Sequence, residues 1–260
     1  MGATDRSDPL AVLAGAPDVA AALSAALSEI DALLWRRDVR AAAAQVAAAS
    51  VERGARDSAA IDGADVVVVD SSPMGRVLDA SLRLTAAVPA QVEVFTSAPL
   101  QAWAHLHAVV AHGFVADDQL GRPRAFEAAD DPLHLGPLPP AGVAADRLAG
   151  LADLLTRRTE APALLVAAVV HAELASVRPF AWGSGLLARA SVRLVLAARG
   201  VDPSMFSIPE HGMFEMGRPA YVAAMRAYAT GTPTGVSDYV VWHSTALAMG
   251  AKAVSAPTPA

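Results

Sequence analysis

The sequence predicts an all-α fold, and three observations carry that prediction. Hydrophobic residues make up 54% of the 260 residues, and many of them are alanine, the best helix former. Aromatic residues make up only 5%, which is few for a β-sandwich, whose strands favour aromatic side chains. Apolar residues also recur at helical spacing along most of the chain. We therefore expect one sizeable helical domain, with a helical extension at its N-terminus.

Two helices are expected at the N-terminal end. Apolar residues at three- and four-residue spacing predict a helix over 18–35. The alanine-rich residues 38–56 predict a second helix. We assign residues 1–57 to the N-terminal helical extension and residues 58–252 to the main helical domain.

The next segment mixes one strand-like run with two helices. Residues 65–70 read Asp-Val-Val-Val-Val-Asp, and β-branched residues alone would predict a short strand. Ser72 and Pro73 are typical of a helix start, because the hydroxyl can cap the helix and proline fits its first turn. Helices are expected over 72–89 and 99–113.

The helical pattern breaks in the middle of the chain, where glycine and proline become frequent. These residues are Gly121, Pro123, Pro132, Gly136, Pro137, Pro139 and Pro140. A long irregular stretch inside a compact domain is usually functional or folds as a hairpin. We predict a short β-hairpin over residues 121–140.

Helices return in the C-terminal half. They are expected over 144–158, 162–177, 185–199, 219–228 and 236–252. The helix over 162–177 is the most apolar, so we expect it to be central and buried on every side. Residues 203–217 are expected to form a loop, and residues 253–260, with two prolines, a disordered tail.

Charge and composition argue against several classes of protein. The net charge of −6 does not attract nucleic acid or anionic membrane. Cysteine is absent, which excludes disulfides and thiolate metal sites, and no histidine pair has metal-ligand spacing. Residues 1–9 do not resemble a signal peptide, and the apolar run 163–170 is too short to cross a bilayer. We expect a cytoplasmic protein with no metal, nucleic-acid or membrane partner.

The segment between the two most apolar helices carries a recognisable pattern. It reads H-A-E-L-A-S-V-R-P-F-A-W-G-S-G-L-L-A-R from His171 to Arg189. This resembles the motif H-x-x-F-x-x-I-H-P-F-x-D-G-N-G-R-x-x-R of the Fic (Fido) domain family. The identical positions are His171, Pro179, Phe180, Gly183, Gly185 and Arg189.

Two other segments agree with this resemblance. Residues 121–140 look like the flap hairpin that precedes the motif in the family. Ser58, Asp62 and Gly63 are similar to the family's inhibitory motif S-x-x-x-E-G, with aspartate in place of glutamate. The resemblance covers residues 58–199 and implies an all-α Fic-like domain.

The resemblance also implies that the family's usual chemistry is lost. In the family, the motif histidine is the general base for protein adenylylation, but Arg178 stands in its place and arginine cannot accept a proton. Trp182 replaces the acidic residue that binds Mg²⁺, and Leu186 replaces an arginine that contacts phosphate. Ser184 replaces an asparagine. The base, the metal ligand and one charge clamp are therefore missing together.

Some of the ligand-binding frame survives. Gly183 and Gly185 allow close backbone approach, and the helix that follows them would point free N–H groups at an anion. With Ser184 and Arg189 these residues form a candidate anion site, for which ATP or another nucleotide is the candidate ligand. In the alternative, the glycines only make a tight turn, Ser184 caps the helix, and Arg178 and Arg189 are solvated.

The resemblance makes one prediction that distances can test. The family's inhibitory glutamate pairs with the second motif arginine, so Asp62 is expected to pair with Arg189, within about 6 Å. In the alternative, Asp62 and Gly63 only form a turn. Among the histidines, His171 is expected in the core, and His211 is a candidate substitute base.

Three functions remain open at this point. The first is a binding or regulatory module without nucleotidyl transfer, with a protein partner or a second copy as its partner. The second is a divergent Fic-type transferase that moves AMP with a base from elsewhere in the chain. The third is a structural helical protein with an empty pocket.

Overall fold

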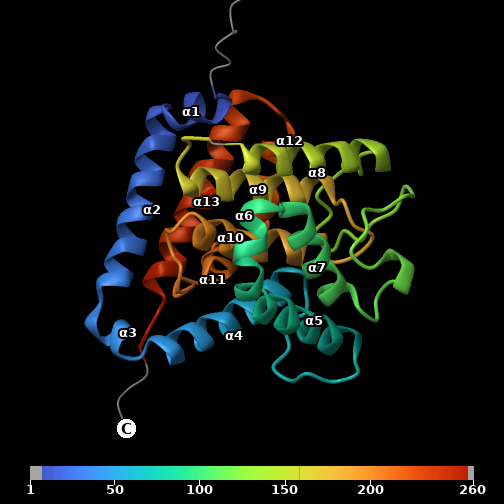
Figure 1. Cartoon of the computed structure of the whole chain (residues 1–260), viewed down its shortest axis with the longest axis horizontal. Coiled ribbons are helices and arrows are strands. Elements are labelled where there is room, and N and C mark those ends of the chain that lie inside the picture. The colour runs from blue at the N-terminus through green and yellow to red at the C-terminus, as the bar shows by residue number, and fades with distance from the viewer. Residues whose placement is uncertain (1–7, 158, 257–260) are drawn as a thin grey trace, which may run out of the picture.

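The computed structural model describes residues 8–157 and 159–256, and these form a helical domain without β-strands (Figure 1). The predicted all-α class is confirmed. The first helices are α1 (Pro9–Ala14), α2 (Pro17–Trp35), α3 (Arg37–Ala41), α4 (Ala43–Ile61), α5 (Pro73–Ala87), α6 (Val92–Ser97) and α7 (Pro99–Ala111). They are followed by α8 (Ala141–Thr156), α9 (Ala163–Val177), α10 (Ser184–Ala198), α11 (Pro209–Glu215), α12 (Arg218–Ala229) and α13 (Pro233–Lys252).

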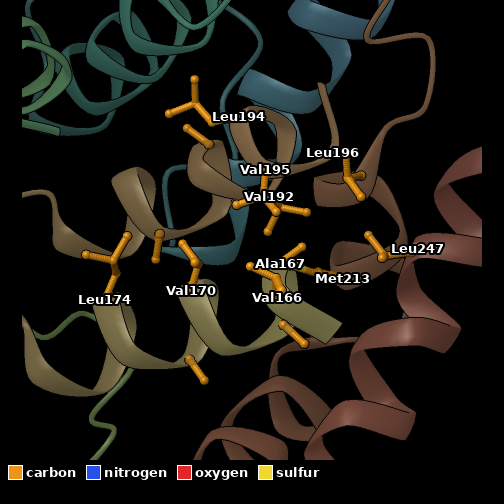
Figure 2. Close-up of a cluster of buried hydrophobic side chains, with 14 of the residues drawn as sticks. Val166, Ala167, Val170, Leu174, Val192, Leu194, Val195, Leu196, Met213 and Leu247 are labelled. Carbon is orange, nitrogen blue, oxygen red and sulfur yellow. The ribbon is translucent and has the colours of Figure 1, made fainter. Parts of the chain in front are cut away.

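The antiparallel pair α9 and α10 forms the centre of the fold. Figure 2 shows Val166, Val170 and Leu174 of α9 facing Val192 and Val195 of α10. Each fully buried side chain of this size contributes roughly 1.5–3 kcal/mol to stability. The prediction that the most apolar helix is central is therefore confirmed.

The remaining helices cover this pair from several sides. In Figure 1, α2 and α13 run side by side along one flank, while α4 and α5 lie across the lower face. One hydrophobic core extends from Leu10 to Val254, so the N-terminal helices share it with the rest of the chain. The boundary predicted at residue 57 falls inside α4 and remains a prediction.

The helix start predicted at Ser72 and Pro73 is confirmed. The Ser72 hydroxyl accepts a hydrogen bond from the Gly75 N–H at 3.0 Å, and Pro73 occupies the first turn of α5. No helix in residues 8–157 and 159–256 combines the length and the apolar content that crossing a bilayer requires.

Three local predictions are corrected. Residues 121–140 contain no strand and form an irregular segment, because the backbone N–H groups of Arg124 and Asp130 bond to the α9–α10 turn and the segment makes no ladder of bonds with itself. Residues 65–70 are an exposed loop, since no neighbouring strand pairs with them. Residues 203–217 contain α11, which the loop prediction missed, and α6 was also missed. The predicted tail and the end of the 144–158 helix lie partly outside the described residues, at 257–260 and 158.

Candidate functional site

The turn between α9 and α10 is a tight backbone reversal at residues 178–183. It begins at Arg178 and ends at Gly183, and both residues have positive φ, at 45° and 75°. A Cβ atom on Gly183 would lie 3.3 Å from the Val110 side chain of α7. Glycine therefore satisfies both the backbone conformation and the close packing at the end of the turn.

Arg178 points away from solvent and into the segment 121–140. Its side chain is 5% exposed and forms an ion pair with Asp131. Its Nη2 donates to the carbonyl oxygens of Gly136 at 2.9 Å and Pro137 at 2.8 Å. Arg178 is therefore not solvated, as the alternative interpretation of the turn expected, because three acceptors of the 131–137 segment surround its guanidinium.

Backbone and side-chain bonds attach the same segment to the turn. The Arg124 N–H donates to the Pro179 carbonyl at 2.8 Å, and the Asp130 N–H donates to the Ala181 carbonyl at 2.9 Å. The buried Arg124 side chain also donates to the Arg178 carbonyl at 2.9 Å. Residues 121–140 thus cover the turn, at the position expected of a flap, without the hairpin pairing.

Arg189 is fully buried behind the turn and contacts the end of α4. Its Nη2 donates to Asp62 at 2.7 Å, and its Nε donates to the Ser58 hydroxyl at 2.8 Å. The predicted contact between Asp62 and Arg189 is therefore present. Asp62 is the first residue after α4 and Gly63 follows it with φ 94°, so the turn brings the short aspartate side chain within reach.

Two carboxylates occupy the N-terminus of α10. Both Asp62 carboxylate oxygens lie 3.5–3.6 Å from where a Cβ atom on Gly185 would be, and Oδ1 is buried without a hydrogen-bond partner among the described residues. The backbone N–H of Gly183 favours the charged form of the Asp130 carboxylate. Burial and the nearby charge of Asp62 raise the pKa of Asp130 to about 6. The candidate anion site is thus filled by the chain's own acidic groups.

Ser184 and Trp182 both make their contacts inside the protein. The Ser184 hydroxyl bonds back to the N–H and carbonyl of Phe180, both at 3.3 Å, so it does not cap the helix. Trp182 stacks on Phe114 with ring centroids 3.7 Å apart. The guanidinium of Arg76 lies 4.8 Å from the centroid of the Phe114 ring. An aromatic stack therefore stands where the family pattern has a metal ligand.

A buried polar chain supports Arg189 from behind. Arg189 Nη1 donates to the Tyr221 hydroxyl at 3.5 Å, and that hydroxyl lies 2.7 Å from His171 Nε2. His171 Nδ1 lies 2.5 Å from the Tyr239 hydroxyl. Burial holds the pKa of His171 well below its usual value. The prediction that His171 belongs to the core is confirmed, since its side chain is not exposed.

His107 is a further residue at the turn, and the sequence did not single it out. Its ring stacks on Phe180 at 4.1 Å between centroids, and its Nδ1 accepts the Gly121 N–H at 2.9 Å. Burial lowers the pKa of His107 to about 4, so the ring is neutral. Spacing along α7 carried no signal for it, because both partners are distant in sequence.

His211 lies in a different cluster. Its Nδ1 is 2.9 Å from Asp57, and Arg53 also contacts the ring. None of the hydrogen bonds that His211 makes within the described residues reaches the 178–189 segment. The geometry therefore does not support His211 as a substitute base at the turn.

Comparisons with known proteins identify the fold. No sequence-family model and no curated protein sequence matches the chain. A Fic family protein from Desulfovibrio desulfuricans G20 superposes with a TM-score of 0.72 at 19% identity, over 91% of this chain and 74% of that protein. A fragment of Fic-1 from C. elegans superposes with a TM-score of 0.67 at 18% identity, over 90% of this chain and 72% of that fragment. The chain therefore has the all-α fold of Fic family proteins, as the motif around the α9–α10 turn predicted.

Proposed function

We propose that this chain is a binding or regulatory module on a Fic-like fold, and that it does not transfer nucleotides. The observation that carries this proposal is the position of Arg178. A guanidinium stays protonated at physiological pH and cannot act as a general base. Its contacts with Asp131, Gly136 and Pro137 also turn it away from any attacking hydroxyl and toward the covering segment.

Two further side chains support the absence of transfer. Trp182 offers an aromatic face stacked on Phe114, whereas Mg²⁺ requires oxygen ligands. Leu186 is buried and has no charge to stabilise a phosphate. Phosphoryl chemistry depends on positioned charge around the transferred group, and these positions no longer supply it.

The same site supports a regulated ligand pocket. A helix N-terminus attracts anions through its free N–H groups and its dipole. At α10 this position is filled by Asp62 and Asp130, so a nucleotide or another phosphate ligand would have to displace them. A protein partner or a second copy that moves α4 or the 121–140 segment would also remove these carboxylates from the N-terminus of α10.

The test is a labelling experiment with a restored variant. The unaltered chain, incubated with α-labelled ATP, Mg²⁺ and candidate proteins, should transfer no label. A variant that combines Arg178→His, Trp182→Asp, Ser184→Asn, Leu186→Arg and Asp62→Ala regains the family pattern and should label itself or a target. Circular dichroism checks that this variant is folded. Label transfer by the unaltered chain would overturn the proposal.

One observation favours a second candidate, a divergent transferase with a different base. Asp130 lies at the turn, and its raised pKa of about 6 suits proton abstraction near neutral pH. In that case the unaltered chain would transfer label and Asp130→Asn would abolish transfer. Labelling by the unaltered chain separates the two candidates, and its loss in Asp130→Asn would identify Asp130 as the base.

A further inference from the structure

The loop between α4 and α5 exposes an unusual run of valines. Val67, Val68 and Val69 are 85%, 65% and 45% exposed, and Figure 1 shows this loop projecting from the lower edge of the molecule. Met74, at the start of α5, is also exposed. Consecutive exposed apolar residues are unfavourable in water, and such runs are usually explained by binding.

The backbone of this loop is also free to pair. The N–H and carbonyl groups of Val68 and Val69 form no hydrogen bond with any described residue. The Val67 carbonyl accepts only from Arg56 Nη1, at 3.0 Å. Free backbone groups on β-branched residues have the properties of an unpaired edge strand. The chain bends at Val67 and Val68, so pairing would straighten it.

The two ends of the run determine which partner fits. Asp65 and Asp70 flank the valines, and both are exposed. Antiparallel pairing of two copies would set Asp65 opposite Asp70 at both ends, and parallel pairing would bring like residues together. Like charges opposite each other destabilise a strand pair, whereas opposite charges stabilise it. The charges therefore disfavour a second copy and favour a partner strand with basic ends.

We propose that residues 65–70 are a docking strand for an extended segment of a partner protein, with Lys or Arg at each end of a β-branched stretch. The segment adds to residues 65–70 by main-chain hydrogen bonding, and the flanking charges select it. Packing of Val66 against Ala59 and Leu78 anchors the strand on α4 and α5. This surface does not involve the α9–α10 turn, so the inference goes beyond the proposed function and stands or fails independently of it.

The probe is the capped peptide Lys-Val-Thr-Val-Thr-Lys, titrated into the full chain labelled with ¹⁵N. Binding should be saturable below about 1 mM and should shift the amide resonances of residues 65–70. The same peptide with Glu at both ends should bind at least about tenfold more weakly, because its charges oppose Asp65 and Asp70. Equal binding of the two peptides, or none up to that concentration, would overturn the proposal.

Backbone variants test the pairing itself. Val67→Pro and Val68→Pro each remove an N–H, and strand N–H groups point alternately to the two edges, so at least one variant should lose binding. Val67→Thr and Val68→Thr keep the β-branched shape and should bind as the unaltered chain does. Thermal unfolding should be nearly unchanged in all four, since the loop is exposed. Peptide binding that survives both proline variants would contradict strand addition.

A charge variant gives an independent readout. Asp65 makes no hydrogen bond or ion pair with a described residue, so Asp65→Lys should not disturb folding. In an antiparallel pair of two copies, this variant sets opposite charges against each other at both ends. Asp65→Lys should therefore self-associate more strongly than the unaltered chain in sedimentation velocity, and should lose its preference for the basic peptide. An unchanged oligomeric state together with an unchanged peptide preference would contradict the role of the flanking charges.

Discussion

Asp62 and Arg189 form an ion pair of 2.7 Å although they stand 127 positions apart in the sequence. Arg189 is fully buried, and Asp62 is 9% exposed in its side chain. The pair joins the C-terminus of α4 to the second turn of α10, beside the turn that carries Gly183. Because Ser58 on α4 also accepts from Arg189, the end of α4 is held against the candidate site by a single guanidinium.

Removing the Asp62 carboxylate should therefore lower the free energy of unfolding. Asp62→Ala leaves a buried guanidinium without its counter-charge, and breaking such a pair typically costs about 3–5 kcal/mol. The remaining Ser58 contacts favour the lower end of that range. Urea unfolding measures the free energy, with Asp153→Ala as the control, because the Arg157–Asp153 pair is 3.8 Å long and exposed and contributes about 0–1 kcal/mol. Equal losses of unfolding free energy in both variants would mean that the Asp62–Arg189 pair stabilises the fold no more than an exposed pair does.

The contact between Asp62 and Arg189 is one of the features that could be predicted from the sequence. Periodicity predicted most helices, since apolar spacing and helix starts such as Ser72 and Pro73 are local signals. The motif register placed Asp62 against Arg189, because residue order in a known pattern encodes a contact that periodicity does not.

Other features could not be predicted, for physical reasons. The covering segment 121–140 has the glycines and prolines of a hairpin, but its backbone bonds to Pro179 and Ala181, which only the tertiary fold brings near. His107 contacts Phe180 and Gly121, again across distant segments. The burial of Arg178 could not be predicted either, because an arginine is usually exposed unless the fold assembles acceptors around it.

The contacts of Arg178 predict that it orders the covering segment. Arg178→Ala removes the donors of three partly buried bonds, to Asp131, Gly136 and Pro137, which should cost about 2–4 kcal/mol. Amide hydrogen exchange should accelerate in residues 124–137, including the Leu135 N–H that bonds to Asp131. Arg157→Ala, at an exposed side chain, should change stability by no more than about 0.5 kcal/mol. If amide exchange in residues 124–137 is as slow as in the unaltered chain, the remaining hydrogen bonds to the turn are enough to order the segment.

Asp130 should make stability depend on pH. Its pKa is raised from 3.8 to about 6 in the folded chain, so the folded state keeps a proton that the unfolded state releases. Stability from this group is therefore fully present below about pH 4 and is lost as the pH rises to about 6. Asp130→Asn keeps the size and shape of the side chain but carries no charge. After allowance for partial exposure, it should be more stable than the unaltered chain by about 1–2 kcal/mol at pH 7, and nearly equal to it at about pH 3.5. Urea unfolding at several pH values measures this difference, and a difference independent of pH would contradict the assignment.

The chain behind Arg189 predicts the protonation of His171. Arginine only donates, so the Tyr221 hydroxyl accepts from Arg189 and gives its own proton to His171 Nε2. His171 then carries its proton on Nδ1 and donates it to Tyr239. Tyr221→Phe breaks two of these bonds and should cost about 1–3 kcal/mol, whereas Tyr239→Phe breaks only one and should cost less. Nitrogen NMR shifts of the imidazole report the tautomer directly. A proton on Nε2 in the unaltered chain would contradict this assignment, because His171 would then donate to Tyr221 and accept from Tyr239.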